Sequence, residues 1–197
     1  MLVLPALFDE ANKLRRLTVE VMRRLDLAEI DSVLPDLPGC NESRQPLGTQ
    51  TLAHWRQSAV AASTRFGATH VLTLRGGALI APGDMPGWAY APVAGRKVLR
   101  AMLRARTIAA REAGREETIE ALQEQARAEG IELAGWKLGA AMFAQLESAA
   151  PEEDGAQVEI DQATLRGGGL WLRAEPDEDP AQADALAACI ANGMAAA

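Results

Sequence analysis

The first part of the chain alternates between short apolar runs and longer amphipathic stretches. Leu2–Leu4 is an apolar run stopped by Pro5, as expected of a strand buried on both faces of a sheet. From Asn12 the apolar positions recur with the period of a helix, and most of the basic residues fall outside that apolar face. A second apolar run at 32–34 predicts another strand, which a Pro- and Gly-containing loop ends.

The same order repeats once more after this loop. Thr51 can cap a helix that runs to about Phe66, and a third strand is expected at 69–74. Parallel strands need crossovers long enough to hold a helix, so this alternation predicts a doubly wound, mostly parallel sheet. After Leu74 the Gly and Pro pairs leave room for only a short helical turn before a strand at 88–91.

Residues 94–129 are helical in character, and Gly114 is expected to divide them into two helices. A short extended piece at 131–134 and a helix at 138–146 follow. The pattern thus predicts a helical, lid-like insert at about 94–146. Final strands at 158–160 and 170–172 lead to a terminal helix, and the whole chain, 1–197, is expected to be one α/β domain because its length suits a single core.

Charge and composition then exclude several classes of protein. The formal net charge is −7, whereas a nucleic-acid binder normally shows a basic patch or a basic domain, so no nucleic-acid partner is expected. The only cysteines, Cys40 and Cys189, form no CxxC pair and no cluster with histidine, so neither a disulfide nor a metal site is expected, and no cofactor is indicated. The N-terminal apolar run is too short for a signal peptide or a membrane span, which predicts a cytoplasmic protein without a transmembrane segment.

Ligands of open α/β sheets lie beyond the carboxyl ends of the strands, so the loop after 69–74 is a candidate ligand site. A hydrolase of the α/β type places its nucleophile there, on a tight strand-to-helix turn of pattern G-x-S-x-G. This chain has small residues at Gly76 and Gly77, but Arg75 occupies the nucleophile position. A guanidinium stays protonated at physiological pH and cannot attack a carbonyl. A Ser-His-Asp triad at this turn is therefore not expected.

The remaining candidates for catalysis are weak. His54 and His70 are the only histidines and both precede Arg75, whereas the expected chain order places the base last. An atypical hydrolase would have to combine Ser43 or Cys40 with His54. The acidic neighbours of Cys40 would raise its pKa, so they oppose formation of a reactive thiolate.

A binding role for the same region is the alternative. An arginine suits carboxylate or phosphate, and backbone N–H groups at a helix start add to that preference. Arg75 would then bind a small anionic or acyl-bearing ligand, or else it pairs with an acidic residue (Asp9, Glu10 or Asp36) and replaces the lost catalytic network. The candidate ligand-binding residues are Asn12, Lys13, Arg15, Arg16, Asp36, Glu10 and Arg75. Asp36 and Ser43 can equally be turn residues that bond to local backbone.

Several segments together resemble a known family. Leu7-Phe-Asp-Glu-Ala-Asn-Lys-Leu-Arg-Arg16 is similar to a Phe-x-Glu-Glu-x-Asn-Lys-x-Arg-Arg signature, and 34–43 and 74–79 are similar to its Pro-Asp-Leu-x-Gly-Cys and Leu-Arg-x-Gly-Ala-Leu segments. These motifs belong to the second type of exosortase A system-associated hydrolase, a branch of the α/β-hydrolase superfamily. The region between about 147 and 165 looks shortened relative to that family.

The resemblance implies an α/β-hydrolase fold and a role near exopolysaccharide production and the sorting of proteins with a PEP C-terminal signal. Combined with Arg75 at the turn, it predicts a pseudo-hydrolase that binds an anionic or acyl-bearing ligand. The alternatives are an atypical ester or acyl hydrolase, and an interaction protein that uses the basic face of 94–129 to dock a protein partner or an anionic membrane surface.

Overall fold

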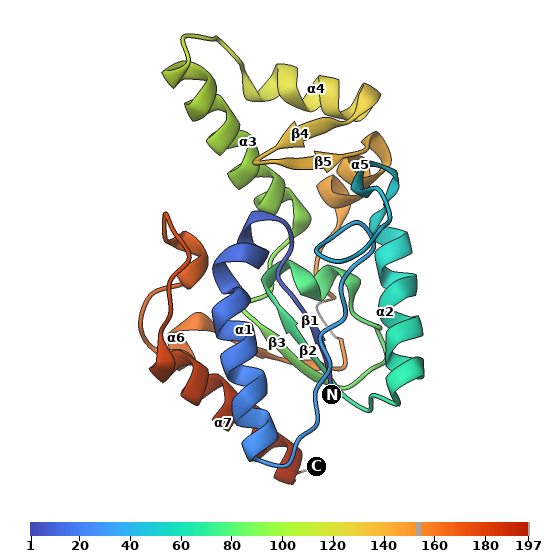
Figure 1. Ribbon diagram of the computed structural model, residues 1–197, viewed down its shortest axis with the longest axis vertical. Helices are drawn as coiled ribbons and strands as arrows, with labels where there is room; N and C mark the ends of the chain where they lie inside the picture. Colours follow the sequence, from blue (N-terminus) through green and yellow to red (C-terminus); the bar gives the residue numbers. More distant parts are fainter. Residues whose placement is uncertain (153–154, 197) are drawn as a thin grey trace.

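A computed structural model describes residues 1–152 and 155–196 (Figure 1). Its elements in chain order are β1 (Leu2–Leu4), α1 (Asp9–Leu27), η1 (Leu47–Thr49), α2 (Leu52–Phe66), β2 (Val71–Leu74), η2 (Arg75–Ile80), β3 (Gly87–Tyr90), α3 (Gly95–Glu112), α4 (Ile119–Glu129), β4 (Ile131–Leu133), β5 (Trp136–Leu138), α5 (Ala140–Ser148), β6 (Gln157–Ile160), α6 (Gln162–Leu165), η3 (Leu170–Leu172) and α7 (Pro180–Ala196), where η marks a 3-10 helix.

The centre of the molecule is a four-stranded parallel sheet in the order β1-β2-β3-β6. Alternate residues of β2 point to opposite faces: Leu72 and Leu74 pack with α1 and α7, whereas Val71 packs in the cluster that contains the α2 residues. Helices thus lie on both sides of the sheet (Figure 1). The prediction of a mostly parallel α/β fold is confirmed.

The strand expected at 32–34 is reduced to a single bridge. Val33 donates its N–H to the Met1 carbonyl and accepts from the Val3 N–H, so it sits in parallel beside Leu2. The ladder cannot continue, because Pro35 has no N–H to donate and restricts the backbone of the residue before it.

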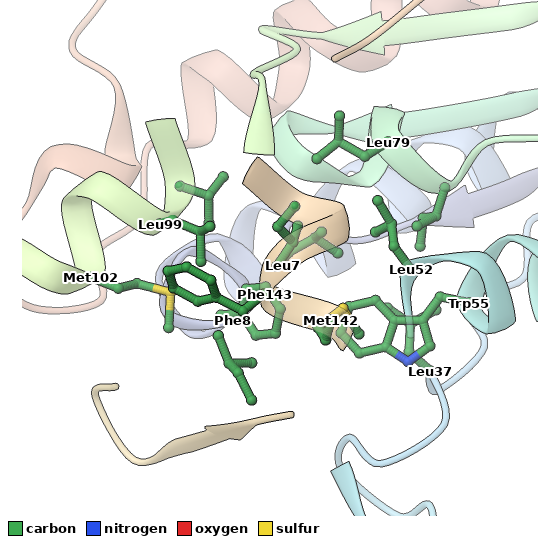
Figure 2. Packing of buried hydrophobic residues seen from close by; sticks show 14 of the residues in the cluster. Leu7, Phe8, Leu37, Leu52, Trp55, Leu79, Leu99, Met102, Met142 and Phe143 are labelled. Atoms are coloured by element: carbon green, nitrogen blue, oxygen red, sulfur yellow. The ribbon is translucent and has the colours of Figure 1, made fainter. Parts of the chain in front are cut away.

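The segment between β3 and β6, here called the insert, is mostly helical and stands over the carboxyl ends of the strands, at the top of Figure 1. It consists of α3, α4, the hairpin β4-β5 and α5. Figure 2 shows Leu99, Met102 and Phe143 of the insert converging on Leu7 and Phe8, which follow β1. All five side chains are at most 4% exposed, so the insert and the sheet share one hydrophobic core.

Two elements of the insert and the C-terminal region differ from the predictions. The extended piece at 131–134 is one half of a hairpin, whose turn has left-handed φ angles of 49° at Ala134 and 80° at Gly135. Such angles suit a two-residue hairpin turn, but Ala-Gly is a weaker signal than Asn-Gly. The strand expected at 170–172 is wrong: Leu170–Leu172 forms a 3-10 turn that follows a run of three glycines.

Among the described residues, no helix combines the length and the apolar composition that a membrane crossing requires.

Candidate functional site

The site is built around the turn that follows β2. Arg75 comes directly after this strand and adopts a left-handed φ of 53°, which is strained for a residue with a side chain. Gly77 allows the turn to approach the end of β1, because a Cβ there would lie 2.6 Å from the Leu4 and Pro5 carbonyl oxygens. The chain therefore turns sharply from β2 into the 3-10 helix η2, with Arg75 at the strained position of the turn.

The Arg75 guanidinium is held on three sides. Its Nε and Nη2 donate to the two carboxylate oxygens of Glu10, each at 3.1 Å, and its Nη1 donates to the Ala91 carbonyl at 2.9 Å. The indole of Trp171 lies against it, with Cζ 4.0 Å from the ring centroid, a cation–π arrangement. A guanidinium has five N–H donors, so these three hydrogen bonds leave two for a ligand.

Glu10 reaches Arg75 because α1 begins earlier than its apolar pattern indicates. The helix starts at Asp9 rather than Asn12, and Asp9 and Glu10 lie in its first turn. Carboxylates are favoured there by the helix dipole. One turn later, Lys13 forms an ion pair with Asp9 at 2.9 Å. The beginning of α1 thus supplies two acids, each already paired with a cation.

A cavity of about 360 Å³ opens beside this network. Its polar lining consists of Asp9, Glu10, Lys13, Arg75 and Lys97, and its apolar lining of Leu7, Val98, Ala101, Met102, Ala105, Ala134, Trp171 and Leu172. The two carboxylates are matched by two of the three cations. Lys97 of α3 is the third, and it pairs with no carboxylate within 1–152 and 155–196. The lining therefore carries one positive charge that an anion would balance.

Asp36 and Asn12, two further candidates, lie elsewhere. They line a second, smaller cavity of about 40 Å³, which shares Leu7 with the first and is also lined by Phe8 and Trp55. Asp36 accepts from Asn41 Nδ2 at 2.8 Å and from the Glu42 N–H at 3.3 Å. Its hydrogen bonds organise its own loop, in agreement with the interpretation of Asp36 as a turn residue.

The structure does not bring the hypothetical nucleophiles to a histidine. Ser43 Oγ accepts from the Gly39 N–H at 2.9 Å and the Gln45 N–H at 3.3 Å, which makes it a turn residue. Burial, assisted by Asp36, raises the pKa of the Cys40 thiol to about 11. His54 is exposed on α2, and its ring forms no hydrogen bond with a described residue.

Arg15 and Arg16 also lie outside the Arg75 cavity. Arg15 lines the smaller cavity with Asn12. Arg16 points to the surface and pairs with Glu20 at 3.3 Å and Glu178 at 3.0 Å. Of the seven candidate ligand-binding residues, Arg75, Glu10 and Lys13 line the cavity at the strained turn, whereas Asn12, Arg15 and Asp36 line the smaller one.

Sequence reasoning missed the residues that complete the site from distant parts of the chain. Trp171 stands against Arg75 and also meets Tyr90 edge to face, with centroids 5.9 Å apart. The Tyr90 hydroxyl donates to Gln162, and burial raises the pKa of Tyr90 to about 12 despite the opposing effect of Arg75. Lys97 lies in the helical segment expected at 94–129, where a basic residue by itself does not indicate a site. A tryptophan after a glycine run signals no role until the fold places it over Arg75.

No protein-family model matches the sequence, and no curated protein matches it either. The described residues contain no group of three or more histidines, cysteines or carboxylates arranged to hold a metal ion.

Proposed function

We propose that this chain is a pseudo-hydrolase of the α/β-hydrolase type that binds a small anionic, acyl-bearing ligand in the cavity beside Arg75. The proposal rests on which residue stands at the strained position of the turn after β2. A hydrolase uses this turn to present a nucleophile toward the carboxyl edge of the sheet. Here the turn presents Arg75, a permanent cation and hydrogen-bond donor.

The lining of the cavity supports the class of ligand. A carboxylate could accept from the two remaining N–H groups of Arg75 while the Lys97 ammonium supplies the unmatched charge. The rest of the lining is apolar, and half of its residues, including Val98 and Met102, come from α3. Cations and apolar side chains in one cavity suit a carboxylate that carries a hydrocarbon chain.

The alternative, an atypical ester or acyl hydrolase based on Ser43 or Cys40 with His54, receives no support from geometry. A nucleophile and its base should lie within hydrogen-bond reach of each other. Ser43 instead accepts from backbone N–H groups, and the raised pKa of Cys40 keeps it a neutral thiol near pH 7. The link to exopolysaccharide production and to PEP-signal sorting stays a proposal that rests on the resemblance of the motifs.

Isothermal titration calorimetry with octanoate tests the binding role. We expect saturable binding, and we expect Lys97→Met to weaken it about tenfold, because one charge-assisted contact is worth about 1.5 kcal/mol. Lys97→Met keeps most of the apolar stem, and Arg65→Gln on the exposed side of α2 is the control that changes net charge equally. The absence of octanoate binding, or equal weakening in both variants, would contradict the proposal.

A parallel assay separates binding from catalysis. The proposal requires that short- and medium-chain p-nitrophenyl esters are not turned over above the rate in buffer. Turnover that disappears in Ser43→Ala or Cys40→Ala would establish an atypical hydrolase instead. Both substitutions remove a hydroxyl or thiol outside the Arg75 cavity, so they leave octanoate binding intact.

A further inference from the structure

We propose that α3 docks the protein onto an anionic lipid bilayer through four arginines, the arginine stripe, which consists of Arg96, Arg100, Arg104 and Arg111. All four side chains are exposed. With about 100° of rotation per residue, they fall within about 80° of the circumference of the helix. From Arg96 to Arg111 there are fifteen helical rises, or about 22 Å along the axis. The stripe is therefore a line of positive charge on one side of a single helix.

The charges of the stripe are not neutralised by ion pairs with described residues. None of the four arginines pairs with a carboxylate among the described residues, although Arg16, Arg24, Arg106 and Arg127 all do. The whole chain carries a net charge of −7, so an unpaired basic line runs against its overall charge. Such a line attracts an extended anionic surface at close range and is screened by salt beyond a Debye length.

Apolar side chains beside the stripe favour a bilayer over an acidic protein. Ile108 lies between Arg104 and Arg111 along the axis of α3 and about 40° beyond Arg104 around it, and its side chain is 59% exposed. Leu172, which is 78% exposed, lines the Arg75 cavity together with Lys97 and Ala101 on the neighbouring flank of α3. A bilayer binds basic residues at its phosphates and apolar residues just below them. An acidic protein surface offers the first interaction without the second.

The apolar side of α3 already contributes to the fold, because Leu99 and Met102 pack in the core seen in Figure 2. Docking thus requires no unfolding of the helix and exposes no buried residue. It also requires no ligand in the Arg75 cavity, so the inference stands apart from the proposed function.

Co-sedimentation with vesicles tests the docking. We expect the protein to pellet with vesicles of phosphatidylcholine and phosphatidylglycerol at low salt, and to stay in the supernatant with phosphatidylcholine alone. High salt should release most of it. Arg100→Gln/Arg104→Gln should lower the partition coefficient at least tenfold, and Ile108→Ser should lower it severalfold. The matched control, Arg44→Gln/Arg65→Gln, removes two exposed arginines elsewhere and should change it less than twofold.

Three results would overturn the proposal. The first is that the original protein does not pellet with phosphatidylglycerol vesicles at low salt, and the second is an equal loss of vesicle binding in the control variant. The third is that Ile108→Ser binds both vesicles and polyglutamate, an acidic polypeptide, as strongly as the original protein does. The last would indicate an acidic protein partner. Octanoate binding measured without vesicles should be unchanged in Arg100→Gln/Arg104→Gln, because neither arginine lines the cavity, so docking and ligand binding can fail separately.

Discussion

At the scale of single residues, Arg75 combines a strained backbone with a well-held side chain. The strain of its left-handed φ is present in Arg75→Ala but not in Arg75→Gly, since glycine adopts such angles freely. Both variants lose the contacts with Glu10, Ala91 and Trp171. We therefore expect Arg75→Gly to be more stable than Arg75→Ala by about 1 kcal/mol in urea unfolding. An alanine variant as stable as the glycine variant would show that the turn is not strained.

The ion pair between Arg75 and Glu10 gives a second prediction. Both side chains are mostly buried, at 13% and 15% exposed. Removing one partner leaves a poorly solvated charge, so Glu10→Gln should lower the free energy of unfolding by about 2 kcal/mol. In Glu10→Gln/Arg75→Gln the second substitution should cost less than it does alone, because the partner is already gone. Strictly additive losses in the double-mutant cycle would mean that the pair contributes no coupling.

Cys40 offers a titration with a defined direction. Burial raises its pKa from 9.0 to about 11, so the folded protein holds the thiol proton where an unfolded chain releases it. The stabilisation from this group is fully present below about pH 9 and is lost as pH rises toward 11. In a Cys189→Ser background, thiolate absorbance should appear with a midpoint near pH 11. A midpoint near 9 would place Cys40 in a solvated position.

The residues of the site differ in how visible they are in the sequence. Arg75 could be identified because the turn after a buried strand has a known role, and its pairing with Glu10 was one of the alternatives that the sequence left open. Trp171 and Lys97 could not be assigned, because only the packing of η3 and α3 brings them to the cavity that Arg75 lines. The sequence did not indicate their role because they are far from Arg75 along the chain, not because of their residue types.

At the scale of elements, α2 shows a helix start that the sequence specifies. Thr51 was predicted as the cap, and its hydroxyl accepts from the His54 N–H at 3.0 Å. Thr51→Ala leaves this N–H without its partner and should cost about 1 kcal/mol in unfolding free energy, whereas Thr51→Ser keeps the acceptor and should cost much less. Equal losses in the two variants would point to the lost methyl group instead of the cap.

Other elements were harder to predict because their form depends on neighbours. Leu170–Leu172 has the apolar composition of a strand, but it forms a 3-10 turn whose Trp171 packs against Tyr90 and Arg75. The run at 32–34 has one partner on β1 and then meets Pro35. Both segments have a composition that suits a strand, but the available pairing partner decides whether a segment becomes one.

At the scale of the whole molecule, the parallel sheet and the insert could be predicted, but the way they join could not. Apolar periodicity located the insert, since its helices repeat at the helical period. It did not reveal that Leu99, Met102 and Phe143 would meet the segment after β1 (Figure 2). Likewise, the net charge of −7 does not reveal the arginine stripe, because a total charge does not say where the charged residues lie.

The shared core implies that the insert and the sheet unfold together. Phe143 is fully buried in α5, so Phe143→Ala should cost about 4 kcal/mol. Native-state hydrogen exchange should then speed up by the same factor in α5 and in β2, since both would exchange through one global opening. Leu186→Ala in α7, fully buried on the opposite face of the sheet, is the reciprocal control and should accelerate exchange in α5 as well. If Phe143→Ala accelerates exchange in the insert alone, the insert is an independent unit that covers the carboxyl edge without being built into it.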